Sequence, residues 1–180
     1  LLGEIIARVA NSSYAEFMER KIFRPLRMNN TAVFNLASGA CTLFCRVYGM
    51  QKRFICFGEK RRADLNYLDG VFGDAGIYTT ARDLLRWDAA LRDGTLLPMK
   101  IYSRAYISGT LNDGTPTDYG YGWEIRSPYV VDHFGEWEGF TAYFRRDLKA
   151  ENCLIILSNL GPPAYVHVIA NELEKFVGNS

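Results

Sequence analysis

The sequence predicts an α+β fold, in which an antiparallel sheet is flanked by helices and joined to a mainly helical region. Residues 1–117 carry apolar side chains mostly at helical spacing, interrupted by loops. Residues 118–180 carry short strand-like runs and end in another helical pattern. Because short connections favour antiparallel pairing, we expect both regions to build one domain around an antiparallel sheet.

The composition is that of a packed globular domain. The chain has 180 residues, of which 48% are hydrophobic and 23% are charged, and its formal net charge is +1. This balance provides no overall field that would attract nucleic acid, and the basic run at residues 60–62 is interpreted as the edge of a loop. No apolar run approaches the roughly 18 to 20 residues that a membrane-spanning helix needs. We therefore expect a soluble domain.

Two helices are predicted at the start of the chain. The first carries apolar residues at helical spacing and stops at Asn11, and Ser13 and Glu16 have the spacing of a capping box for the second. Pro25 ends the second helix because proline lacks an N–H group. Since Leu1 already lies within a helical pattern, we expect the chain to be the C-terminal part of a longer polypeptide.

The region from Asn29 to about Asp69 is predicted to be loop with short strands, and it contains three of the four cysteines. A disulfide of Cys56 with Cys41 or Cys45 is an open alternative, which would imply an oxidising compartment. Cys153 is interpreted as a small buried residue of a strand. With no Cys-x-x-Cys pair and only two histidines, the sequence predicts no metal site and no cofactor.

Two more helices are predicted before the strands. Thr80 and Asp83 cap the first, which Leu84, Leu85, Trp87 and Leu91 line and Gly94 closes. Pro98 begins the second.

Four strands are expected at residues 119–125, 129–133, 140–144 and 152–158, with turns at Ser127-Pro128 and Arg146-Asp147. Residues 153–157 are apolar without alternation, which is typical of a strand covered on both faces. The last helix is expected to cover one face of the sheet with Tyr165, Val168, Ile169, Leu173 and Phe176.

A search for catalytic motifs leaves one segment. The sequence contains no Ser-x-x-Lys, Tyr-x-Asn, Gly-x-Ser-x-Gly or phosphate-binding loop. Residues 132–140 combine His133 with Gly135 and Gly139, and glycines let a ligand approach the backbone. A structural histidine at a strand end is the alternative, and Glu136 and Glu138 fit a solvated edge as well as a pair of carboxylates.

Six segments resemble the beta-lactamase-related serine hydrolases, the family of class C beta-lactamases, D-alanyl-D-alanine carboxypeptidases and related esterases. They occur in the family's order and span nearly the whole chain: residues 1–6 (Leu-Leu-Gly-Glu-Ile-Ile), 22–31, 73–84, 119–123 (Tyr-Gly-Tyr-Gly-Trp), 133–135 (His-Phe-Gly) and 156–159 (Ile-Leu-Ser-Asn). The resemblance implies part of a beta-lactamase or penicillin-binding-protein fold, in which the active site lies between sheet and helical region.

The resemblance also implies roles for residues of the third motif. A Ser-x-x-Lys serine attacks an amide, lactam or ester carbonyl in that family, and a Lys/His-x-Gly strand closes the site. His133 would orient substrate, Gly135 would leave room for it, and the backbone N–H of Glu136 would donate to the oxyanion. Arg27 stands where the family usually has the glycine of Pro-Leu-Gly-Met. This long side chain argues against the turn's usual backbone conformation.

Three hypotheses follow from this comparison of motifs. The first is a C-terminal fragment of a serine hydrolase, inactive alone, whose parent acts on a small-molecule or peptide substrate and is periplasmic or secreted as the resemblance suggests. The second is a non-catalytic domain that binds peptide, cell-wall fragment or a partner. The third is self-association through an uncovered sheet edge.

Overall fold

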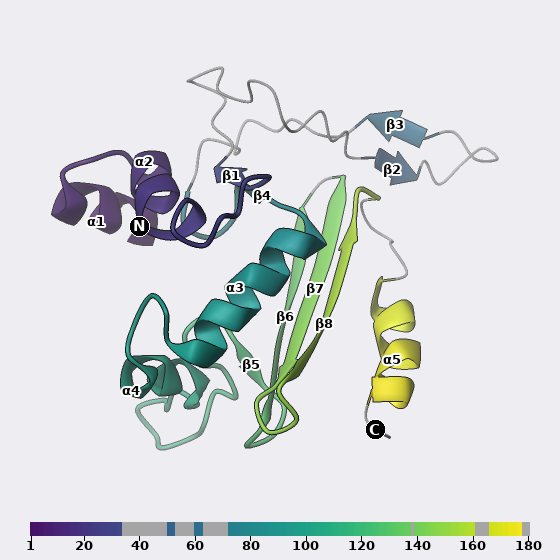
Figure 1. Ribbon diagram of the computed structural model, residues 1–180. Coiled ribbons are helices and arrows are strands. Elements are labelled where there is room, and N and C mark those ends of the chain that lie inside the picture. Colours follow the sequence, from purple (N-terminus) through teal and green to yellow (C-terminus); the bar gives the residue numbers. More distant parts are fainter. Residues whose placement is uncertain (34–49, 53–59, 63–71, 138, 161–165, 178–180) are drawn as a thin grey trace.

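The fold is organised around a four-stranded antiparallel sheet, which confirms the predicted α+β class (Figure 1). The computed structural model describes residues 1–33, 50–52, 60–62, 72–137, 139–160 and 166–177. The strand order is β5-β6-β7-β8. The strands are β5 (Glu124–Ile125), β6 (Val130–Trp137), β7 (Phe140–Asp147) and β8 (Asn152–Ser158).

Helices and two small strand pairs surround this sheet. The helices are α1 (Leu2–Ala10), α2 (Tyr14–Met18) with the π-helical turn η1 (Glu19–Phe23), α3 (Ala81–Asp93), α4 (Met99–Tyr102) with the 3-10 turn η3 (Ser103–Tyr106), and α5 (Val166–Val177). The pairs are β1 (Ala32–Val33) with β4 (Ile77–Tyr78), and β2 (Met50–Lys52) with β3 (Lys60–Arg62). Cys41, Cys45 and Cys56 lie outside the described residues, so their disulfide stays a prediction.

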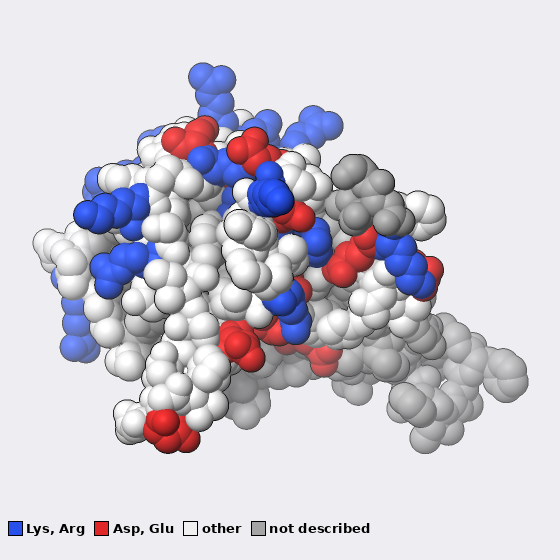
Figure 2. Space-filling model, turned by 90° about the horizontal axis from the view of Figure 1, so that it is seen from below, with Lys and Arg blue, Asp and Glu red and all other residues white. Residues whose placement is uncertain are grey.

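The two faces of the sheet are covered by different helices. Helix α3 crosses the face that carries Arg146, and α5 packs on the opposite face, where Val166 and Ala170 are buried against Tyr143 (Figure 1). In the part of the chain that the structure describes, no helix has the length and apolarity to cross a membrane. Charged side chains of both signs occur on the face shown in Figure 2.

The inward face predicted for the last helix is wrong. Val168, Ile169, Leu173 and Phe176 are exposed, and Tyr165 lies outside the described residues. The row that faces the sheet is Val166, Ala170 and Glu174, because the hydroxyl of Tyr143 donates to Glu174 at 2.6 Å. Tyr143 thus meets α5 through both a polar contact and the buried side chains of Val166 and Ala170. Among the described strands none pairs with the outer edge of β8, and the expected self-association there stays a prediction.

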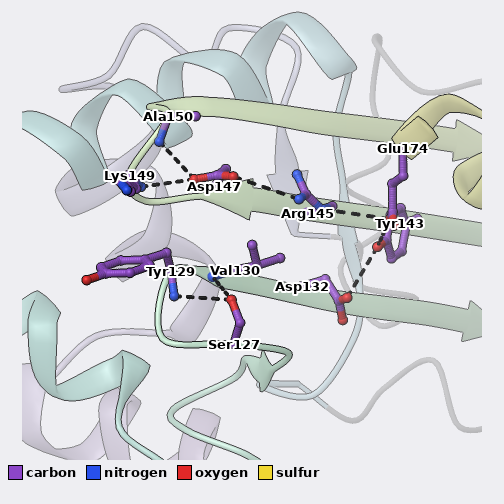
Figure 3. A network of polar contacts seen from close by, with 10 residues as sticks. All are labelled: Ser127, Tyr129, Val130, Asp132, Tyr143, Arg145, Asp147, Lys149, Ala150 and Glu174. Atoms are coloured by element: carbon purple, nitrogen blue, oxygen red, sulfur yellow. Dashed lines mark hydrogen bonds and ion pairs between the residues drawn. The ribbon is translucent and has the colours of Figure 1, made fainter. Parts of the chain in front are cut away.

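The strand boundaries also differ from those predicted. Only Glu124 and Ile125 of the segment 119–125 form a strand, because the residues before them fold into a tight turn. The turn expected at Arg146-Asp147 lies inside β7. The chain reverses after Asp147, whose carboxylate accepts from the N–H groups of Lys149 and Ala150 at 3.0 and 2.8 Å (Figure 3). Strand β8 is only partly covered on its two faces, since Leu157 is 38% exposed.

The N-terminal helices are held by a close backbone contact. The Ser13–Glu16 capping box is confirmed, and Phe23, Met28 and Val33 form a small core beneath α2. A Cβ on Gly3 would lie 2.5 Å from the carbonyl oxygen of Phe72, and one on Gly73 would lie 2.7 Å from the nitrogen of Gly3. Both glycines are therefore required where α1 meets the chain that leads to β4.

Two buried aspartates connect α3 to the rest of the molecule. Leu85, one of the apolar residues predicted to line this helix, is exposed instead. Asp83 is fully buried and accepts from the N–H of Asn30 at 2.7 Å and the hydroxyl of Thr31 at 2.9 Å. Asp88 pairs with Arg146 of β7 at 2.6 Å, and these side chains are only 1% and 2% exposed. Carboxylates, rather than leucines, are the most buried residues of the helix.

The surroundings of Arg146 complete this ion pair. Its guanidinium also donates to the hydroxyl of Tyr106 and lies 5.7 Å and 5.9 Å from the ring centroids of Tyr106 and Trp123. Burial, with Asp88 adding to it, raises the pKa of Cys153 to about 11. That thiol is half-buried and stays protonated at neutral pH, as its interpretation as a small packing residue requires.

Removal of the Asp88 carboxylate is expected to destabilise the chain strongly. Asp88→Ala leaves the Arg146 charge buried without its partner, and we expect the free energy of unfolding to fall by about 3–5 kcal/mol in urea denaturation. The control is Glu4→Ala, which removes the partner of Arg8 from an ion pair whose side chains are 61% and 78% exposed. It is expected to change stability by about 0–0.5 kcal/mol. Similar losses in both variants would contradict the importance of the buried pair.

The turn at Arg27 provides a second test. Arg27 has a φ of 55°, in the left-handed region that favours glycine, so the chain adopts there a conformation suited to the family's glycine. We expect Arg27→Gly to raise the free energy of unfolding by about 0.5–1 kcal/mol. Arg24→Gly, at a φ of −65°, should lower it by about 0.5–1 kcal/mol. Thermal and urea unfolding measure both, and a loss of stability in Arg27→Gly would refute the assignment of strain.

Candidate active site

Strand β6 presents His133 and Gly135 on the same face of the sheet. Side chains alternate along a strand, so Val131, His133, Gly135 and Trp137 share the face covered by α3, and Asp132, Phe134 and Glu136 share the face covered by α5. His133 is exposed. The residue opposite His133 on β7 is Phe144, whose ring packs edge-to-face against Trp123. The strand thus carries an exposed imidazole beside the strand position of Phe144.

Tyr119 contacts His133 directly. The Tyr119 hydroxyl lies 2.9 Å from Nε2 of His133, and the two rings meet edge-to-face with centroids 6.0 Å apart. The sequence placed Tyr119 in a motif of the family resemblance but did not assign it to the site. No sequence signal links residues 14 positions apart across a turn, so this contact could be found only in the fold.

Among the described residues, little pairs with the outer edge of β6 beside His133 and Gly135. On the edge of β6 that faces away from β7, strand β5 pairs only with Val131 and Asp132, and no described strand pairs with that edge beyond Asp132. Val130 directs its N–H and C=O toward the β5 side, so the two-residue period of a strand directs those of Glu136 to the same edge. The backbone N–H of Glu136 therefore faces the open edge, as an oxyanion donor would require.

The Glu136 carboxylate lies apart from His133. It projects from the opposite face of β6, and Glu138 lies outside the described residues. Because Glu138 is outside the described residues, the alternatives of a carboxylate pair and a solvated edge at Glu136 and Glu138 stay predictions.

Neither a close contact nor a left-handed backbone explains why position 135 is glycine. A Cβ there would contact only the Cβ of Ala142, at an ordinary 3.7 Å, and Gly135 is not among the residues with positive φ. Neither packing nor backbone conformation within the described chain requires glycine. The missing side chain leaves free space beside His133.

A polar network anchors β6 from its other face (Figure 3). Asp132 is buried and accepts from Arg126 at 2.7 Å, and the hydroxyl of Tyr143, which donates to Glu174, lies 3.2 Å from its carboxylate. Burial, followed by the hydrogen bond to Glu174, raises the pKa of Tyr143 well above its ordinary value, so it remains a donor. The residue before His133 is thus held by partners from β7 and from the loop after β5.

Within the described residues, no contact pairs a nucleophile with a base beside His133. The sequence has no Ser-x-x-Lys or Tyr-x-Asn, and the parts of the chain that are described hold no cluster of three metal-ligating side chains. The described arrangement is an exposed imidazole beside a strand edge whose backbone N–H and C=O groups have no described strand partner.

The comparisons with known proteins establish the family. The chain matches the Beta-lactamase family over residues 1–178. It therefore belongs to this family, that of the beta-lactamase-related serine hydrolases.

Relatives of this chain include penicillin-binding proteins and peptidases. It is 31% identical to Penicillin-binding protein 4* of Bacillus subtilis (strain 168) over 169 residues, which cover 88% of this chain and 38% of the relative. It is 24% identical to the D-alanyl-D-alanine-carboxypeptidase/endopeptidase AmpH of Escherichia coli (strain K12), covering 98% of this chain and 44% of the relative. The chain thus spans less than half the length of these relatives.

A solved structure shows the same fold. The penicillin binding protein from Bacillus halodurans superposes with a TM-score of 0.73 at 20% identity, covering 96% of this chain and 52% of that chain. This likeness supports the partial beta-lactamase-like fold predicted from the sequence.

The free space at Gly135 gives a prediction about stability. Gly135→Ala should change the free energy of unfolding by less than about 1 kcal/mol, because the added Cβ meets only Ala142 at 3.7 Å. The matched variant Gly3→Ala should cost more than about 2 kcal/mol, because its Cβ would overlap the carbonyl of Phe72. Urea denaturation measures both. A large loss in Gly135→Ala would mean that this glycine serves packing instead of a ligand.

Proposed function

We propose that this chain supplies the substrate-orienting strand of a serine hydrolase that acts on an amide, lactam or ester through an acyl-enzyme. The Ser-x-x-Lys and Tyr-x-Asn residues would come from sequence that precedes Leu1 in a longer polypeptide. By itself, the chain would lack hydrolytic activity. The observation that carries the proposal is the placement of the exposed His133 and of Gly135 on one face of β6, next to an edge that no described strand pairs beyond Asp132.

Each residue has a role in this proposal. The His133 imidazole would bind the substrate and take part in the proton network near the nucleophile. Gly135 would let the substrate lie against the strand, and the N–H of Glu136 would donate to the developing oxyanion. Such a donor contributes about 10²–10³ in rate in other acyl-transfer enzymes.

The names of the relatives suggest substrate classes. Penicillin-binding protein 4* and a D-alanyl-D-alanine-carboxypeptidase/endopeptidase are among them, which favours a penicillin or a D-alanyl peptide as the first compounds to test. The alternative is a non-catalytic domain that binds the same kinds of ligand through the open edge of β6.

The proposal is tested by comparing two polypeptides. The first is the 180-residue chain, and the second is the product of the same reading frame extended upstream of the Leu1 codon. We expect fluorescent penicillin to label the extended polypeptide, as seen in a denaturing gel and by intact mass, and to leave the chain itself unlabelled. Labelling of the chain alone would refute its predicted inactivity. Absence of any Ser-x-x-Lys upstream would favour the non-catalytic alternative.

Substitution of His133 tests the role of the strand. In the extended polypeptide, His133→Ala is expected to lower the rate of ester or peptide hydrolysis by about 10- to 100-fold, because the substrate loses an orienting contact. His167→Ala is the control, since His167 belongs to α5 and stacks on Phe134 at the opposite face of the sheet. Steady-state kinetics of both variants, with circular dichroism to verify folding, give the comparison. Unchanged kinetics in His133→Ala would refute the assigned role.

A further inference from the structure

The Tyr-Gly-Tyr-Gly-Trp segment at residues 119–123 has no role in the function proposed so far. It forms a tight turn between the helical region and the sheet, and it ends at Trp123, whose ring packs against Tyr106 and Phe144. Only one side chain of the segment reaches β6, through the contact between Tyr119 and His133. The construction of the turn explains why Tyr119 is there.

Gly120 fixes the turn against the helical region. A Cβ at this position would lie 2.0 Å from the carbonyl oxygen of Ala105, so only glycine fits. That carbonyl accepts from the N–H of Tyr121 at 3.0 Å, and the N–H of Gly120 donates to Trp123 at 2.8 Å. The backbone that follows Tyr119 therefore packs closely against η3 and is hydrogen-bonded to it.

The backbone of Tyr119 is held on its other side as well. Its carbonyl accepts from the N–H of Gly109 at 2.9 Å, and its N–H donates to the hydroxyl of Thr117 at 3.3 Å. Tyr119 is also bridged to Glu124 at the start of β5. A tyrosine that is 40% exposed is thus held from several directions with its hydroxyl toward the imidazole.

We propose that Tyr119 is a positioning residue that selects the tautomer of His133. The phenol donates its proton to Nε2, so neutral His133 carries its own proton on Nδ1. Within the described structure Nε2 has Tyr119 as its partner, whereas Nδ1 has none. The Nδ1–H group is then the donor available to a ligand.

The role of Tyr119 rests on the proposed function, because a fixed donor at position 133 matters only if a substrate lies along β6. The tautomer can be tested whether or not that function is correct. The tautomer of His133 is a property of the chain itself and is measurable without any catalysis.

The test is long-range ¹H–¹⁵N correlation NMR of the chain labelled with ¹⁵N-histidine, at a pH where histidine is neutral. The chain has two histidines, and His167→Gln identifies the signals of His133. We expect the pattern of the Nδ1–H tautomer in the parent chain. In Tyr119→Phe, which keeps the ring and removes the hydroxyl, we expect a shift toward the Nε2–H tautomer.

Tyr121→Phe is the matched control. It removes a hydroxyl from the same turn, on a side chain that is 70% exposed, and it should leave the His133 signals unchanged. An Nε2–H tautomer in the parent chain, or an unchanged tautomer in Tyr119→Phe, would overturn the proposal. Circular dichroism shows whether both variants fold.

A kinetic measurement separates this inference from the proposed function. In the extended polypeptide, Tyr119→Phe is expected to lower kcat by about 2- to 10-fold with little change in KM, the size expected for one hydrogen bond. Added to His133→Ala, it should cause no further loss, because both changes act through one imidazole. If His133→Ala has no effect, the proposed function fails. If only the tautomer is insensitive to Tyr119, the present inference fails alone.

Discussion

The buried ion pair of Arg146 and Asp88 is the interaction on which the rest of the structure depends. It joins β7 to α3, and both side chains are almost completely withdrawn from solvent. Two buried opposite charges are tolerated only when their remaining hydrogen-bonding groups also find partners. Tyr106, the Asp88 carbonyl and Arg92 provide such partners, so the ion pair constrains the helical region and the sheet together.

This constraint extends to the candidate site through aromatic contacts. The Arg146 guanidinium lies near the rings of Tyr106 and Trp123, and Trp123 ends the turn that carries Tyr119. Trp123 thus links the ion pair to the turn whose own backbone contacts hold Tyr119 beside His133. On the other face, Asp132 and Tyr143 hold β6, and Tyr143 contacts α5.

Local patterns predicted much of the fold because local interactions build those parts. The Ser13–Glu16 capping box, the N-cap of α3 at Thr80, the left-handed ends of helices at Asn11 and Gly94, and the apolar run of β8 are each determined by a few neighbouring residues. The sequence failed where tertiary polar contacts decide. The apolar stripe on α5 predicted an inward face, yet Glu174 and Tyr143 turn a different row toward the sheet. Nothing in the spacing of Asp83 and Asp88 indicates that they are the most buried residues of α3.

The same distinction applies to the candidate site. His133, Gly135 and Glu136 are neighbours in sequence, so a short motif could identify them, and their roles stay predictions. Tyr119 could not be identified in this way because the fold, not the chain, brings it to His133.

The most direct test of the account is a crystal structure of the extended polypeptide after acylation by a penicillin. The account predicts an acyl carbonyl oxygen about 2.7–3.1 Å from the backbone nitrogen of Glu136, with the ligand lying across Gly135 beside His133. The account would be contradicted by an acyl group held away from β6. It would also be contradicted if the part of the β6 edge beyond Asp132 made no contact with the ligand.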